Sequence, residues 1–173
     1  MQRLIVKATD EEIIWAQILA SERSRYKSSL KVSSARLDPK HDDDAITTQG
    51  YLAEILFCRI FGAHLNIDLF PGKDDGVDVN WKGMSFQIKS SFKSDADLTL
   101  RYSHQVKVNE PLSAEHFILV RPVSGKTNCF ELLWIPKDVA MVCFEKKNMI
   151  GGISELVPAK FMRSAARLLD IYP

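Results

Sequence analysis

The chain of 173 residues has no apolar run that approaches the roughly 20 residues needed for a membrane-spanning helix. Its first residues lack the apolar segment and the small-residue cleavage site of a secretory signal peptide. Cysteine is scarce, because the three present lie far apart and follow neither a metal-ligand nor a disulfide spacing. These absences argue against a disulfide-stabilised secreted scaffold and favour a cytoplasmic protein without a membrane anchor.

The chain also lacks a charge imbalance, since 23 Lys and Arg stand against 22 Asp and Glu. A near-neutral total gives no sign of a nucleic-acid partner, but a local basic groove is enough to bind one. With 46% hydrophobic residues and no internal repeat, the sequence predicts one compact domain with an ordinary core.

The predicted elements are two helices, a run of about five strands and short C-terminal helices. The first helix is expected to start in the run Thr9-Asp10-Glu11-Glu12, with the Thr or the Asp as its cap, and to run to about Tyr26. The second, apolar almost all round, is expected from Gln49 to about Phe61. Residues 28–46 between them are predicted to form a loop. Strands or extended segments are expected at residues 65–70, 77–79, 84–89, 98–102, 116–120 and 129–135, and short helices at 139–144 and 159–169. This order indicates an α/β (α+β) fold with a central mixed sheet flanked by helices.

The single domain divides by composition into three parts. Residues 1–46 hold the first helix and a charged loop, residues 47–135 the core, and residues 136–173 the C-terminal helical elements. The run His41-Asp42-Asp43-Asp44 invites a metal interpretation. Three consecutive acids converge poorly on one ion, so a solvated loop or the acidic start of a helix is the better interpretation.

Residues 72–89 are the most informative stretch. A first strand places Asp78 between two valines, and a second strand, residues 84–89, carries Gln87 and Lys89 on one face. A hairpin with an acid on one arm and an amide-x-lysine pair on the other suits a metal-dependent phosphodiesterase. Such an enzyme needs a hard cation held by oxygens, an activated water and positive charge near the developing phosphorane.

Each of these side chains can perform a specific chemical role in such a site. Asp78 can supply a carboxylate ligand, and Gln87 or the backbone carbonyl of Ile88 can supply a neutral oxygen. Lys89 can position the nucleophile or offset the charge of the phosphate. Mg²⁺ suits such a site because it keeps several waters and needs few protein carboxylates, and Mn²⁺ can substitute for it.

Glu54 is the one carboxylate of the apolar second helix. A buried carboxylate needs a partner, and Glu54 can reach the same ion if its helix packs on the hairpin. The alternative is a salt bridge to Arg59 or to a lysine elsewhere in the chain.

The sequence Asp-Asp-Gly-Val-Asp-Val, followed by Phe-Gln-Ile-Lys, resembles a pattern of the PD-(D/E)XK nuclease superfamily. It is similar to the Asp-Gly-Gly-Ile-Asp…Val-Gln-Cys-Lys motif of Mrr-type restriction endonucleases and Holliday-junction resolvases, over about residues 47–135. The resemblance implies a restriction-endonuclease-like core in which Asp78, Lys89 and the helical Glu54 are catalytic. Gln87 then stands where the family usually has an acid, as in its Gln-x-Lys branch, which lowers the negative charge of the site.

The resemblance and the residues together predict a Mg²⁺-dependent deoxyribonuclease. Cutting both strands of a duplex favours two-fold symmetry, so a homodimer is possible. Charge alone adds weaker candidates for contact with DNA: Lys31, Ser90, Lys93 and Arg101. The competing hypothesis is a catalytically inactive nuclease-fold module that binds nucleic acid or a protein partner, because Gln87 leaves the site one acid short.

Overall fold

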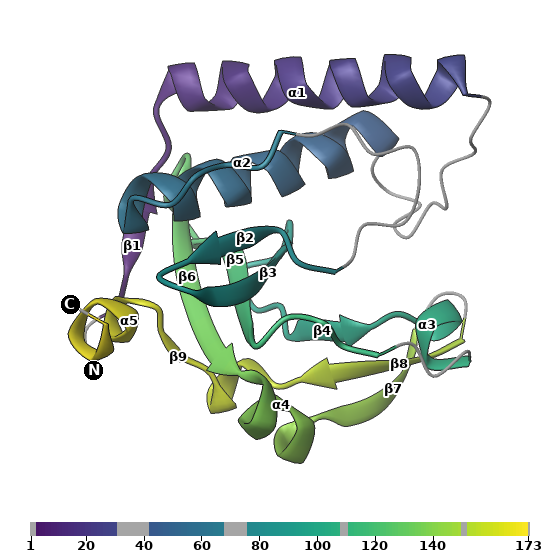
Figure 1. The fold of residues 1–173 in the computed structure, drawn as a ribbon, viewed down its shortest axis with the longest axis vertical. Helices are drawn as coiled ribbons and strands as arrows, with labels where there is room; N and C mark the ends of the chain where they lie inside the picture. The colour runs from purple at the N-terminus through teal and green to yellow at the C-terminus, as the bar shows by residue number, and fades with distance from the viewer. Residues whose placement is uncertain (1–2, 31–41, 68–75, 108–110, 150–151, 173) are drawn as a thin grey trace.

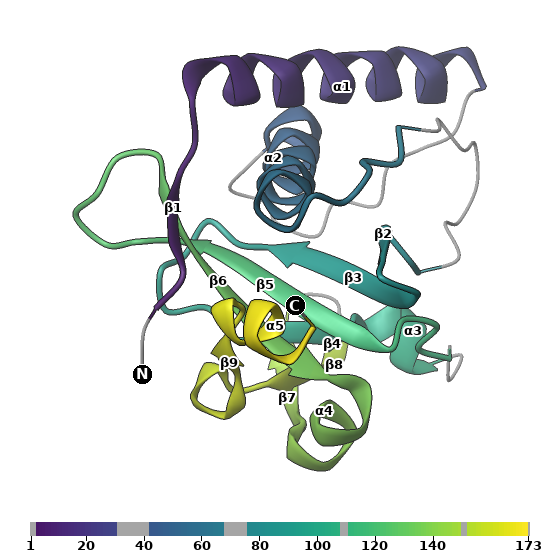
Figure 2. The same ribbon diagram turned by 60° about the vertical axis from the view of Figure 1, so that its left-hand side comes forward.

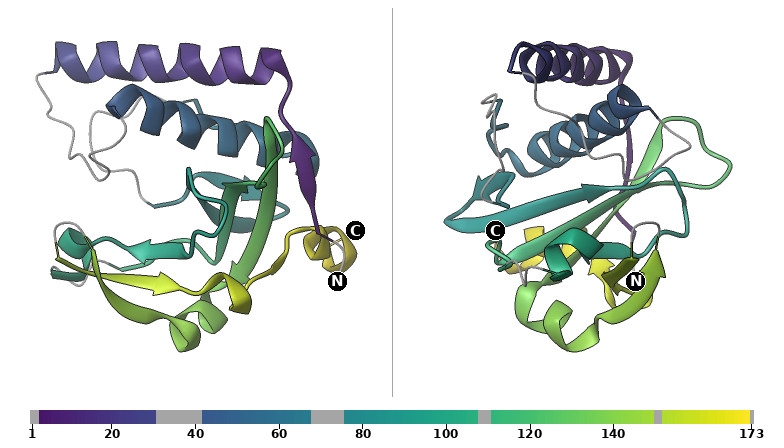
Figure 3. Two further views of the ribbon diagram at one scale, coloured as in Figure 1. Left: turned by 180° about the vertical axis from the view of Figure 1, so that it is seen from behind. Right: turned by 90° about the vertical axis from the view of Figure 1, so that its right-hand side faces the viewer.

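The computed structural model describes residues 3–30, 42–67, 76–107, 111–149 and 152–172 (Figure 1). The elements form layers in the order α1, α2, a larger mixed sheet and a smaller antiparallel sheet (Figures 2 and 3). The prediction of an α/β (α+β) fold with a central mixed sheet is therefore confirmed. None of the described helices is long and apolar enough to cross a bilayer.

Helix α1 (Asp10–Ser29) begins where the sequence predicts. Thr9 Oγ1 accepts a hydrogen bond from the Glu12 N–H at 3.2 Å, and Glu12 Oε2 accepts one from the Thr9 N–H at 2.8 Å. This reciprocal capping box satisfies two N–H groups that the first helical turn cannot pair internally. The helix lies along the outside of α2 (Figure 1).

Helix α2 (Asp43–Phe61) begins six residues before the predicted start at Gln49. Asp42 is its N-cap, since its side chain accepts a hydrogen bond from the Ala45 N–H at 2.6 Å. Asp43 and Asp44 lie in the first turn, where the helix dipole favours negative charge. The acidic run is thus a helix start. The loop prediction is wrong for residues 43–46, and also for residues 28–29, which belong to α1.

The larger sheet that the structure describes has the strand order β1-β6-β5-β3-β2, with β9 also paired to β6. Its strands are β1 (Ile5–Lys7), β2 (Val79–Trp81), β3 (Met84–Ser90), β5 (His116–Pro122), β6 (Cys129–Pro136) and β9 (Arg163–Ser164). β3 and β5 are parallel, and the other pairs are antiparallel, which makes the sheet mixed. β1 and β9 were not predicted.

The smaller sheet, in the order β4-β8-β7, was predicted only in its first strand. It consists of β4 (Leu98–Arg101), β7 (Glu145–Met149) and β8 (Gly152–Val157). Short helical elements complete the fold: α3 (Ser103–Lys107), α4 (Lys137–Cys143), η1 (Ala159–Phe161) and α5 (Ala166–Ile171). The helix predicted over residues 159–169 is wrong, because β9 interrupts it by pairing with β6. Residues 65–67 form no strand, and 68–70 lie outside the described residues.

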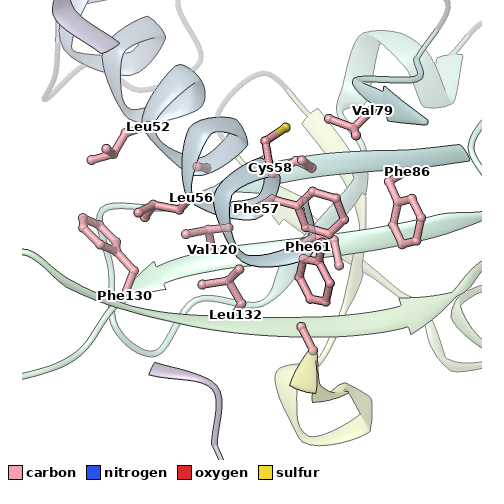
Figure 4. Close-up of a cluster of buried hydrophobic side chains, with 14 of the residues drawn as sticks. Leu52, Leu56, Phe57, Cys58, Phe61, Val79, Phe86, Val120, Phe130 and Leu132 are labelled. Atoms are coloured by element: carbon pink, nitrogen blue, oxygen red, sulfur yellow. The ribbon is translucent and has the colours of Figure 1, made fainter. Parts of the chain in front are cut away.

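Alternation along β3 divides the side chains between two cores. Phe86 and Ile88 face α2, whereas the register sets Gln87 opposite Phe117 of β5, whose side chain belongs to the core beneath the sheet. The ring of Phe57 on α2 lies 5.2 Å from that of Phe86, between ring centroids (Figure 4). Helix α2 therefore packs on the hairpin, which is the condition on which a role for Glu54 depends.

His116, at the start of β5, helps to hold β3 in place. Its ring stacks on Phe86 with centroids 5.0 Å apart, and its Nδ1 accepts a hydrogen bond from Trp134 Nε1–H at 3.3 Å. Burial lowers the pKa of His116, although the nearby charges of Glu115 and Asp138 act in the opposite direction. The folded protein thus favours the neutral imidazole.

This preference predicts a pH dependence of stability. An unfolded histidine takes up a proton near pH 6.5, whereas folded His116 resists it, so the free energy of unfolding should fall as the pH drops from 6.5 toward the lowered pKa. His116→Gln keeps an acceptor for Trp134 but does not titrate. We expect the loss of Tm between pH 7 and pH 5 to be larger in the wild type, by about 2 °C or more. Equal losses of Tm in the wild type and in His116→Gln, measured by calorimetry, would contradict this prediction.

Candidate active site at the edge of the central sheet

Asp78 lies where the chain leaves the sheet ladder. Its N–H donates to the Phe86 carbonyl at 2.9 Å, and its Oδ2 accepts a hydrogen bond from the Ile88 N–H at 2.6 Å. The pairing of Val79 with Phe86 would set Val77 opposite Ile88, but Val77 packs into the core on the other side of the sheet. The Asp78 carboxylate therefore takes the place of a backbone acceptor at the edge of β3.

The backbone carbonyl of Ile88 points to the same edge. The N–H and C=O of one strand residue are directed to the same side, and the N–H of Ile88 is bonded to Asp78. β2 begins only at Val79 and pairs with Met84–Phe86, so among the described strands β3 is the border of the sheet beside Ile88. Two of the predicted oxygen ligands are thus brought together.

Gln87 occupies a buried position beside this edge. The residue is 9% exposed, and its Nε2 lies 3.6 Å from the point where a Cβ on Gly76 would stand. Among the described residues we find no hydrogen-bond partner for its side-chain amide. An unpaired buried polar group costs about 1–3 kcal/mol, so a bound ion or water is expected there.

Gly76 lies at the entry to the hairpin, beside Gln87. Its φ is +76°, a conformation that favours glycine, and it brings the backbone close to the Gln87 amide. The positive φ is what favours glycine here, since a Cβ would meet the Gln87 amide only at an ordinary contact distance.

Lys89 follows Gln87 on the same face of β3. It stands opposite Leu119 of β5, and its side chain is half-buried. In the part of the chain that the structure describes, its ammonium group forms no ion pair with a carboxylate. It is therefore available to an anion such as a phosphate.

Glu54 lies on α2 one turn before Cys58, so the two share one side of the helix. In Figure 4 the Cys58 side chain leaves α2 toward Val79, at the β2 end of the sheet. Burial raises the pKa of the Cys58 thiol to about 12, and the negative charge of Glu54 adds to the rise. Glu54 therefore lies on the β2 side of α2, which is also the side of Asp78. Arg59, its proposed salt-bridge partner, pairs with Glu12 at 2.8 Å.

The weaker candidates for contact with DNA do not all lie near the candidate site. Ser90 ends β3, and Lys93 is exposed just beyond it, so both lie close to the candidate site along the chain. Arg101 is on the smaller sheet, where its Nε lies 2.6 Å from Glu155 Oε2 and the two side chains are only 11% and 4% exposed. Lys31 lies outside the described residues.

The donors of the site are hard oxygens. No group of three or more His, Cys, Asp and Glu side chains that could hold a metal occurs within the described ranges. The candidate set includes only two such side chains, Glu54 and Asp78, and adds the Gln87 amide and the Ile88 carbonyl. Carboxylate, amide and carbonyl oxygens suit Mg²⁺, which retains water in its remaining positions. No family model, curated protein or solved structure matches the chain.

Proposed function

We propose that the protein is a Mg²⁺-dependent nuclease that hydrolyses phosphodiester bonds in DNA. The observation that carries the proposal is the edge of β3. There the Asp78 carboxylate lies 2.6 Å from the Ile88 N–H, and the adjacent Gln87 is buried with no partner for its side-chain amide among the described residues. A plain hairpin requires neither the departure of Val77 from the ladder nor the burial of a glutamine whose amide has no partner in the described part of the chain.

The residues have separate roles in this proposal. Asp78, the Ile88 carbonyl and Gln87 hold the cation, and Glu54 contributes from α2 directly or through water. Bound Mg²⁺ would supply an acidified water and polarise the phosphate. Glu54 lies on α2, on one side of the sheet, and the side chain of Gln87 faces the other side, so the edge of β3 is where their contributions can combine.

Lys89 acts on the substrate. Its half-buried ammonium shares a face with Gln87, so it can offset the charge that develops on the phosphate or orient the attacking water. Ser90 and Lys93 follow it in the chain and are the nearest candidates to contact the DNA backbone. The three cysteines are free, as is usual in the cytoplasm, where we place this activity.

A cleavage panel tests the proposal. The purified protein is incubated with duplex, single-stranded and branched DNA, and with RNA, in the presence of Mg²⁺, Mn²⁺ or EDTA. We expect cleavage of at least one DNA substrate with either metal and none above background with EDTA. Binding of DNA without cleavage under every condition would instead favour the inactive nuclease-fold module.

A further inference from the structure

Helix α1 carries apolar side chains on its outer face. Ile14 and Ile18 are 53% and 48% exposed, and Trp15 is 60% exposed. The buried residues of α1 are the small Ala16 and Ala20, which face α2. In Figure 1 α1 is the outermost layer, with the rest of the fold on its α2 side.

Charged residues flank this apolar centre in a regular order. Helical periodicity places one set of residues on the outward side of α1, here called the outer stripe: Glu11, Ile14, Trp15, Ile18, Ser21, Glu22 and Arg25. Glu11 precedes Ile18 by seven residues, and Arg25 follows it by seven. The acid and the base therefore lie about 10 Å from the centre of the stripe, in opposite directions.

We propose that the outer stripe pairs with the outer stripe of a second copy of this chain, with the helices antiparallel and the two-fold axis at Ile18. Each Glu11 then faces the partner's Arg25, and each Ile18 contacts the partner's Ile18. A parallel pair would set Glu11 against Glu11 and Arg25 against Arg25, so the charges select the antiparallel arrangement. Trp15 supplies the large aromatic contact that often dominates small interfaces.

Arg25 already contacts Glu22, but this contact does not prevent it from pairing with the partner's Glu11. Its Nη1 lies 2.8 Å from Glu22 Oε1, but the side chains are 78% and 49% exposed. An exposed pair of this kind contributes little, so Arg25 can be shared with the partner's Glu11. The acidic Glu11 and Glu22 also disfavour an anionic membrane surface as the occupant of the stripe.

The size of the helix sets the expected affinity. A helix of 20 residues is about 30 Å long, so a contact limited to α1 is small for a stable dimer. We expect a dissociation constant on the order of 10–100 µM. The pairing does not depend on nuclease activity.

Analytical ultracentrifugation of the full chain tests the pairing. The mass should rise from 19.6 kDa toward twice that value as concentration increases through this range. Ile18→Lys places two like charges at the axis and should weaken association at least about 100-fold. Val142→Lys, at an exposed position of α4 (85%), is the matched control and should leave the dissociation constant unchanged.

A charge exchange tests the orientation. Glu11→Arg and Arg25→Glu should each weaken association by about 10-fold, because symmetry makes each change act twice. The double variant should return to near the wild-type dissociation constant. A chain that stays monomeric at every concentration, a dimer insensitive to Ile18→Lys, or a double variant as weak as the singles would overturn the proposal. Circular dichroism confirms that each variant is folded.

Discussion

Asp78→Asn is expected to lower the rate of metal-dependent DNA cleavage by at least about 100-fold while the fold is retained. Asparagine keeps a side-chain oxygen that can accept the hydrogen bond from the Ile88 N–H, which spans 2.6 Å in the wild type. It removes the negative charge, and a divalent cation needs that charge when few acids surround it. The measurement is the cleavage rate at saturating Mg²⁺, together with Tm.

Two further variants separate chemistry from structure. Asp95→Asn removes an exposed carboxylate from the loop after β3 and should leave the rate unchanged. Asp78→Ala removes both charge and acceptor, so it should also destabilise the protein by about 1–3 kcal/mol. A wild-type rate in Asp78→Asn would remove Asp78 from the catalytic set.

The second arm of the hairpin could be predicted because its signals are local. The first arm was predicted over residues 77–79, but β2 is Val79–Trp81, so Asp78 lies just before the strand and not within it. Residues 84–89 alternate with a period of two, and β3 forms there. Lys82 and Gly83 both have positive φ, 48° and 79°, as the two-residue turn between twisted antiparallel strands requires. A Lys-Gly pair between two strand patterns is enough to locate such a turn.

The missed elements depend on distant partners. β7 is almost wholly polar and exposed, and it forms because it pairs with β8. β9 is held by Leu133 and Trp134 of β6, about 30 residues earlier. Neither segment has a hydrophobic periodicity of its own, so neither strand could be predicted from the sequence pattern. On α1, apolar side chains occur both on the face that packs on α2 and on the outer face, and only the position of α2 decides which of them are covered.

The candidate site was predictable as a set of residue types but not as a geometry. The order of Glu54, Asp78, Gln87 and Lys89 can be read from the chain, and the packing of α2 on β3 agrees with it. The bond from Asp78 to the Ile88 N–H depends on the path of Val77 into the second core. The burial of Gln87 within the sheet depends on its pairing with β5, a strand that comes much later in the chain. Such contacts leave no local pattern.

Lys89→Met should lower the cleavage rate by about 100- to 1,000-fold with little change in Tm. Methionine keeps an unbranched apolar stem in the half-buried position but carries no charge. If Lys89 acts on the reacting phosphate, the loss falls on the turnover rate, and affinity for DNA in Ca²⁺, measured without cleavage, should change by less than about 5-fold.

Comparison with two lysine variants makes the role of Lys89 specific. Lys93→Met removes an exposed charge four residues further on and should alter the salt dependence of DNA binding rather than the turnover rate. Lys89→Arg restores the charge with a different shape, so partial recovery of turnover is expected if charge dominates. Equal losses of affinity and no loss of turnover in Lys89→Met and Lys93→Met would make Lys89 one more backbone contact, and the catalytic set would then reduce to the carboxylates and the Gln87 amide.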